Sequence, residues 1–258
     1  VSLSDNSQAT TSGFSTTKIT AGFNKNISKI KTWFVSAIFD NRTNFETSHY
    51  NTSSLNLSTG MTYKHKSSQF QVPFQLQAIR MDGDEYRYGL SLGGVWNFII
   101  SPEVSTSAFL QAGRGEFPTA PDKNTDQLFA GAGISQKLSR HLSVSSNLFV
   151  SKDLPWGDGL SHNGKLLFGA RSSLSWTISP KHQAWLAVSP QRIIYDEAAP
   201  FYNDARLETM VDFSTGWKYL FAKKWQLSVT GSYAKNQSNI DLYRYERTQI
   251  KAGLQFKI

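Results

Sequence analysis

The chain has 258 residues, of which 39% are hydrophobic, and its mean hydropathy is −0.37. No stretch approaches the roughly 18 to 20 apolar residues of a transmembrane helix, and the absence of cysteine excludes disulfides and thiolate metal sites. The formal net charge is +8 and the pI about 9.5. The basic residues stand singly and form no nucleic-acid motif, so we expect no nucleic-acid partner.

Apolar and polar residues alternate along thirteen segments, which is the pattern of strands with one apolar and one polar face. In chain order we predict strands at 15–25, 30–42, 52–65, 68–81, 85–99, 102–115, 126–138, 141–152, 163–178, 181–195, 204–221, 224–237 and 246–258. Each has roughly ten or more residues, enough to cross a bilayer at a tilt and longer than the roughly five to six typical of soluble sheets.

The connections between these segments alternate in length. "NKNISK", "KHKSS", "ISPE", "LSRH", "ISPKH" and "FAKK" predict tight turns. "DNRTNFETSHYN", "GEFPTAPDKNTD", "DLPWGDGLSHNG", "DEAAPFYNDA" and "NQSNIDLYRY" predict long polar loops. Short periplasmic turns that alternate with long external loops are typical of outer-membrane β-barrels.

The two faces of the strands also favour a membrane barrel. The polar faces consist of Ser, Thr, Gln, Asn and Gly with few charges, whereas the apolar faces carry bulky aromatic residues. A soluble barrel would place its apolar side chains inside and many Lys and Glu outside. We therefore predict an all-β fold, a closed antiparallel transmembrane β-barrel that forms a single domain over residues 1–258 in the bacterial outer membrane. A secreted β-solenoid or sandwich is the alternative.

This location implies partners. We expect the outer face to contact outer-membrane lipid and lipopolysaccharide. The apolar end of the last segment, with Leu254, Phe256 and Ile258, is expected to be the signal that the barrel assembly machinery recognises.

Thirteen segments conflict with the even strand number of single-chain bacterial barrels. Val1–Ser12 is the only candidate for a further strand and would give fourteen; one segment split wrongly would give twelve. The chain starts without a leader, so we expect a mature product or a fragment that lacks an N-terminal periplasmic domain.

Residues suited to catalysis are sparse. His65, His141 and His182 fall at predicted short turns, and His49 and His162 fall in predicted long loops. "SHNG" at 161–164 resembles the His–Ser–Asn set of an outer-membrane phospholipase, but no partner serine stands out on a neighbouring strand. The acidic "DGDE" at 82–85 indicates a solvated hairpin loop in preference to a cation site. We expect no enzyme, no cofactor and no metal site, and keep a lipid hydrolase as a second alternative.

Charged residues on the predicted inward faces are mostly basic. The basic residues are Lys18, Lys64, Arg87, Lys137, Lys165, Arg171, Lys218, Lys251 and Lys257, and the clear acidic ones are Glu208 and Asp212. They either pair locally and fill space, or they form a cationic interior that favours anionic or hydrogen-bonding solutes.

The last 27 residues, Ser232–Ile258, resemble the final hairpin of the surface lipoprotein assembly modifier family. The matching positions are Ser238, Asn239, Ile240, Tyr243, Tyr245 and Arg247, followed by the alternating last segment. Members of that family join a periplasmic tetratricopeptide domain to a C-terminal barrel of fourteen strands, and no tetratricopeptide helices are present in this sequence.

The resemblance implies an outer-membrane translocation barrel that helps a lipoprotein or another protein reach the cell surface, with that exported client as its partner. The alternative function is a porin-like channel for anionic solutes or for exopolysaccharide export.

Overall fold

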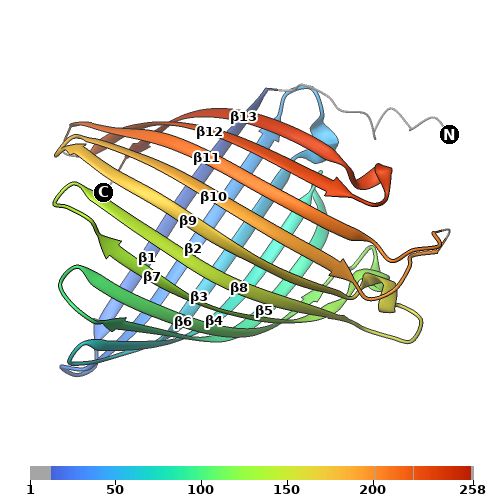
Figure 1. The fold of residues 1–258 in the computed structure, drawn as a ribbon, viewed down its shortest axis with the longest axis horizontal. Helices are drawn as coiled ribbons and strands as arrows, with labels where there is room; N and C mark the ends of the chain where they lie inside the picture. The colour runs from blue at the N-terminus through green and yellow to red at the C-terminus, as the bar shows by residue number, and fades with distance from the viewer. Residues whose placement is uncertain (1–12, 201, 223, 257–258) are drawn as a thin grey trace.

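The computed structural model describes residues 13–200, 202–222 and 224–256. Thirteen antiparallel strands form one sheet in chain order (Figure 1). They are β1 (Phe14–Asn26), β2 (Lys31–Asn44), β3 (Thr52–His65), β4 (Ser68–Met81), β5 (Asp84–Ile99), β6 (Val104–Glu116), β7 (Thr125–Lys137), β8 (Leu142–Pro155), β9 (Lys165–Ser179), β10 (His182–Tyr195), β11 (Leu207–Ala222), β12 (Trp225–Ser238) and β13 (Tyr245–Phe256).

The predicted strands are confirmed, and each of their bounds lies within three residues of the observed one. The described residues contain thirteen strands, so the twelve-strand alternative is wrong. The fourteenth strand predicted in Val1–Ser12 lies outside the described residues.

Four short 3₁₀ helices occupy long loops: η2 (Ser48–Tyr50), η3 (Pro121–Lys123), η4 (Ser161–Asn163) and η5 (Asp241–Tyr243). Within the described residues, no helix has the length and apolar character needed to span a membrane.

Two described strands contain an internal proline, and each of these prolines coincides with a local gap in pairing; a third proline, Pro155, ends β8. The register of β4 with β5 skips Pro73, and the register of β9 with β10 skips Pro190. On the opposite side, both prolines stay in register, with Gly60 and Val211 respectively. A proline has no N–H to donate, so the sheet accommodates each one by giving up pairing on one side only.

One connection departs from the predicted alternation of short and long. Strands β4 and β5 are joined at the long-loop end by Asp82 and Gly83 alone, whose φ angles are 54° and 88°. Two consecutive positive φ angles make a tight hairpin turn, and an Asp-Gly pair tolerates that conformation. The solvated hairpin loop predicted at 82–85 is therefore confirmed, as an exposed two-residue turn.

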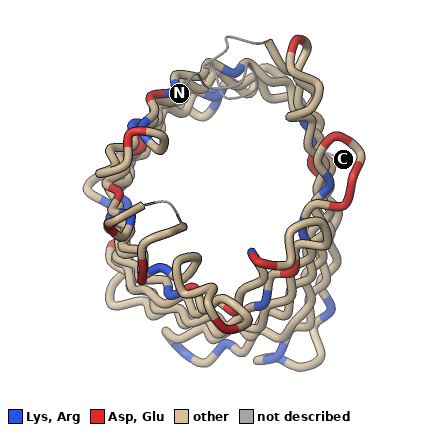
Figure 2. The backbone as a smooth tube through the Cα atoms, turned by 90° about the vertical axis from the view of Figure 1, so that its right-hand side faces the viewer, with Lys and Arg blue, Asp and Glu red and all other residues tan. Residues whose placement is uncertain are grey.

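The sheet curls round on itself. Figure 2, viewed from the long-loop end, shows a ring of strands around an interior that no described backbone crosses. The Lys251 ammonium of β13 lies 5.3 Å from the centre of the Phe14 ring of β1, so the two edge strands approach each other there. Strands β1 and β13 run in the same direction, and no pairing between them is present among the described residues. One further strand would complete antiparallel closure, which stays a prediction.

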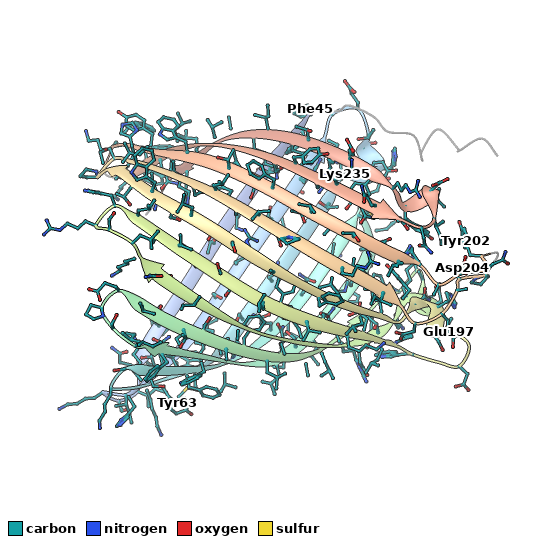
Figure 3. The ribbon with its side chains drawn as sticks, in the orientation of Figure 1. Phe45, Tyr63, Glu197, Tyr202, Asp204 and Lys235 are labelled. Atoms are coloured by element: carbon teal, nitrogen blue, oxygen red, sulfur yellow. The ribbon has the colours of Figure 1, made fainter. Side chains whose placement is uncertain are left out.

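The register assigns every strand residue to the inner or outer face. Figure 3 shows Tyr63 of β3 projecting from the outside of the barrel. Directly paired residues share a face, so Phe70, Trp96 and Leu148 also lie outside, in register with Tyr63 through consecutive strands. The predicted apolar faces therefore point outward, and Leu92, Leu110 and Ile250 are 56%, 63% and 76% exposed. This outer surface suits lipid contact.

Side chains and backbone groups tie the long loops together. Asn51, Asn124 and Asn239 each accept a hydrogen bond from a backbone N–H at the base of their own or the neighbouring loop. Between loops, the Asn163 amide donates to the Asp122 carbonyl at 2.9 Å, and the Asp196 N–H donates to the Gly164 carbonyl at 3.0 Å. These hydrogen bonds connect the long loops at this end of the barrel, which we call the rim.

Candidate functional site

The inner wall of β3 to β6 is joined by a chain of side-chain amides. The Gln77 amide donates to Asn56 Oδ1 at 2.7 Å, and Arg87 Nη1 donates to Gln77 Oε1 at 3.2 Å. Further along the wall, Gln111 Nε2 donates to Ser91 Oγ at 2.6 Å. These residues line a cavity of about 700 Å³ against the inner wall. An amide both donates and accepts, so this surface offers hydrogen bonds of both kinds to a solute.

Charged residues on the inner wall form two exposed or half-buried ion pairs. Lys18 and Asp40, opposite each other on β1 and β2, are 3.5 Å apart with side chains 61% and 42% exposed. Lys165 lies 3.3 Å from Asp153, whose other carboxylate oxygen accepts a hydrogen bond from Gln127 at 2.8 Å. An exposed pair such as Lys18–Asp40 contributes little to stability, whereas the Asp153 carboxylate is mostly buried, with its side chain 11% exposed.

The two acidic residues predicted on the inner face both have partners. Glu208 lies 3.3 Å from Arg206, and their side chains are only 10% and 20% exposed. The Arg206 guanidinium also lies over the rings of Tyr195 and Tyr243, at 3.7 and 3.8 Å from their centres. Asp212 accepts a 3.5 Å hydrogen bond from Gln191.

Six of the predicted basic residues have no ion pair among the described residues. They lie on the inner face and are Lys64, Arg87, Lys137, Arg171, Lys218 and Lys251. Lys257 lies outside the described residues. The structure therefore spreads these six groups round the inner wall instead of gathering them into one cluster.

The predicted assembly signal lies at the lipid-facing end of β13. Leu254 is 61% exposed, and Phe256 packs against Trp225 with ring centres 4.8 Å apart. Ile258 lies outside the described residues. Recognition of this end by the assembly machinery stays a prediction.

Several inner-face residues were missed by the sequence reasoning. Charged examples are Asp40, Arg42, Asp153 and Arg247, which follow the same alternation as their predicted neighbours and could have been found by extending it to the strand ends.

The structure corrects the expected placement of the large aromatic residues, because some of them lie on the inner face. The bulky aromatic side chains were expected on the outer faces alone, yet Phe34, Phe109, Phe129, Phe149 and Trp185 point inward. Each of them stands beside an aliphatic or aromatic residue on at least one side, as in Phe109–Leu110 and Leu148–Phe149. Consecutive apolar residues of one strand point to opposite faces, so one of each pair must turn inward.

Features suited to catalysis or metal binding are few. His162 lies in η4 and lines a cavity of about 50 Å³ with Glu197 and Arg206, and it makes no hydrogen bond to a hydroxyl group in the described part of the chain. No three acidic or histidine residues among those described are placed to hold a metal ion.

No family model matches the chain, and no curated protein matches it. Solved structures do. The outer-membrane channel DcaP of Acinetobacter baumannii matches with a TM-score of 0.54 and 12% identity over 92% of this chain and 83% of its own. A bacterial polysaccharide outer-membrane secretin matches with a TM-score of 0.51 and 7% identity, over 94% of this chain and 91% of its own. The NanC porin matches with a TM-score of 0.50 and 6% identity, over 93% of this chain and 99% of its own.

The chain therefore has the fold of an outer-membrane β-barrel, and the predicted location in the bacterial outer membrane is confirmed. The structures that it resembles are named as a channel, a secretin and a porin. Membership of the surface lipoprotein assembly modifier family stays a prediction.

Proposed function

We propose that this protein is a porin-like channel that lets small polar solutes cross the outer membrane and favours anions. The six inner basic residues without an acidic partner support the proposal most strongly. Counted over the strands, the inner face carries ten basic residues (Lys18, Arg42, Lys64, Arg87, Lys137, Lys165, Arg171, Lys218, Arg247 and Lys251) against five acidic ones (Asp40, Asp84, Asp153, Glu208 and Asp212). A pore with this excess attracts anions and repels cations.

Liposome swelling tests the proposal. Vesicles that contain the purified protein should swell faster with a small organic anion than with a cation of similar size. The variant R87E/R171E/K218E should shift that order toward the cation, because it removes three positive charges from the inner wall and adds three negative ones, which cancels the basic excess. The matched control is R192E on the outer face, where the wall separates the side chain from the solute path. Vesicles that do not swell with either solute would contradict the proposal.

The translocation function stays a prediction that rests on the resemblance of Ser232–Ile258 to the lipoprotein assembly family. It predicts that, when the gene is deleted, a lipoprotein or secreted protein remains inside the cell instead of reaching the surface. Comparison of the surface-exposed proteins of the deletion strain and its parent tests this. A channel for solutes leaves the surface proteins unchanged and alters solute uptake, and a channel for exopolysaccharide alters glycan release.

Contacts with the membrane belong to the same proposal. Outward-facing basic residues lie two or three positions before the loop end of alternate strands: Arg114 of β6, Lys152 of β8, Arg192 of β10 and Lys235 of β12. At that height we propose that they meet the lipopolysaccharide headgroups, while the apolar surface below them meets the lipid chains.

A further inference from the structure

Three phenylalanines form a continuous row on the inner wall of β6, β7 and β8. The ring centres of Phe109 and Phe129 are 5.0 Å apart, and those of Phe129 and Phe149 are 6.0 Å apart. All three point inward by register. They are half-buried, so part of each ring faces the interior.

The rings of this row lie against the wall because glycines make room for them. Phe109 lies over Gly131 and Phe149 lies over Gly169, its partners in register on β7 and β9. A Cβ atom added at Gly169 would come within 2.8 Å of the Phe149 ring, and one added at Gly131 would collide with Phe109. The Phe109 and Phe149 rings therefore reach over the glycines of the neighbouring strands and remain half-buried on the inner wall.

Coverage of a strand glycine by an aromatic ring also stabilises a sheet. The Trp185–Gly216 pair on β10 and β11 is an example that stands apart from the row. Packing accounts for single pairs, but it does not account for Phe129, which pairs in register with Gln111 and Ser151. Phe129 instead connects the other two rings into one apolar surface in an otherwise polar wall.

Amide side chains flank the row. Gln111 and Gln127 line the 700 Å³ cavity together with Phe129. Gln111 Nε2 lies 2.6 Å from Ser91 Oγ and 3.4 Å from Gln75 Oε1. Gln127 Nε2 donates a hydrogen bond to Asp153 Oδ1. Flat apolar surfaces beside groups that donate and accept hydrogen bonds fit one class of solute particularly well. A sugar ring has C–H groups that pack on an aromatic face and hydroxyls that both donate and accept.

We propose that Phe109, Phe129 and Phe149, with Gln111 and Gln127, form an oligosaccharide-binding track on the inner wall. Successive sugar rings pack on the three phenylalanines while their hydroxyls bind the amides. This inference rests on the proposed channel function and names the class of its solute. The unpaired Arg87, which lines the same cavity, favours sugars that carry a carboxylate.

Block of ionic current tests the track separately from conduction. The purified protein in a planar bilayer is exposed to maltohexaose and, separately, to an oligouronate of six residues. We expect at least one of them to interrupt the current, and the oligouronate to do so at the lower concentration. The double variant F109A/F129A should still conduct ions and should need about tenfold more oligosaccharide for the same fractional block, equivalent to about 1.4 kcal/mol.

Two variants make the result specific. F129Y keeps the ring and should keep the block, whereas F168A removes an exposed phenylalanine of the outer face and should change nothing. A channel that conducts but is blocked by neither sugar, or is blocked equally well in F109A/F129A, overturns the track and leaves the channel function standing. A protein that does not conduct overturns both.

Discussion

The inner wall has two unlike halves. From β3 to β8 it carries the linked amides and the phenylalanine row, with Lys64, Asp84, Arg87, Lys137 and Asp153 as its charged residues. From β9 through β13 to β1 and β2 it carries ten charged residues: Lys165, Arg171, Glu208, Asp212, Lys218, Arg247, Lys251, Lys18, Asp40 and Arg42. The two halves offer different chemistry, hydrogen bonding with apolar contact on one and charge on the other. A solute that is polar, cyclic and anionic matches both.

The largest effect is expected from a change that prevents the barrel from folding and so removes both halves of the inner wall. Leu227 lies in β12 and is paired on both sides, with Tyr219 of β11 and Leu254 of β13. L227P removes a ladder hydrogen bond in the middle of the wall, so we expect no folded barrel. Electrophoresis without heating, in which a folded barrel migrates differently from an unfolded one, measures this.

The control for that change is L242P in η5, where the backbone N–H donates no hydrogen bond among the described residues. This variant should fold. If L227P also folds and conducts, the strand assignment of β12 is wrong.

The next effect separates the halves by charge. Neutralising the charged half in R171Q/K218Q/K251Q should move the reversal potential toward cations, because three unpaired positive charges leave the solute path. The variant Q75A/Q111A/Q127A changes the amide half without changing charge and should leave the reversal potential where it was. Equal shifts in both variants would show that the halves do not differ in the way that the structure implies.

A smaller effect, on the free energy of unfolding, is expected when either of two ion pairs of the charged half is broken. R206A leaves Glu208, which is 10% exposed, without its partner and removes the stack on Tyr195 and Tyr243, so we expect a loss of about 1–3 kcal/mol in unfolding free energy. K18Q breaks an exposed pair and should have no measurable effect. Urea unfolding followed by tryptophan fluorescence checks both.

R206K divides the effect of R206A into its parts. It keeps the charge beside Glu208 but loses the planar group that stacks between the tyrosines. An unfolding free energy midway between wild type and R206A is expected. A variant as stable as the wild type would show that the positive charge beside Glu208 accounts for the whole stabilisation by Arg206.

Much of the fold follows from the sequence because each strand is long and alternates strictly. Leu207, Val211, Phe213, Trp217 and Tyr219, for example, all lie on one face of β11, and one slip would turn them away from lipid. The strand bounds and the inner position of residues such as Arg171 and Lys218 come directly from this period.

The rest depended on information that alternation does not carry. The phenylalanine row was missed because Phe109 and Leu110 are both apolar, and only register with Gly131 shows which of them faces inward. The partners in the ion pairs were not identified because Lys165 and Asp153 lie on different strands, and their distance depends on the stagger between β8 and β9.

The most direct test of the central claim is the reversal potential of the wild-type protein in a planar bilayer under a gradient of KCl. A channel whose inner wall carries ten basic residues and five acidic ones should conduct, and the sign of the potential should show that chloride crosses more readily than potassium. Conduction with preference for potassium, or no conduction by folded protein, would contradict the account.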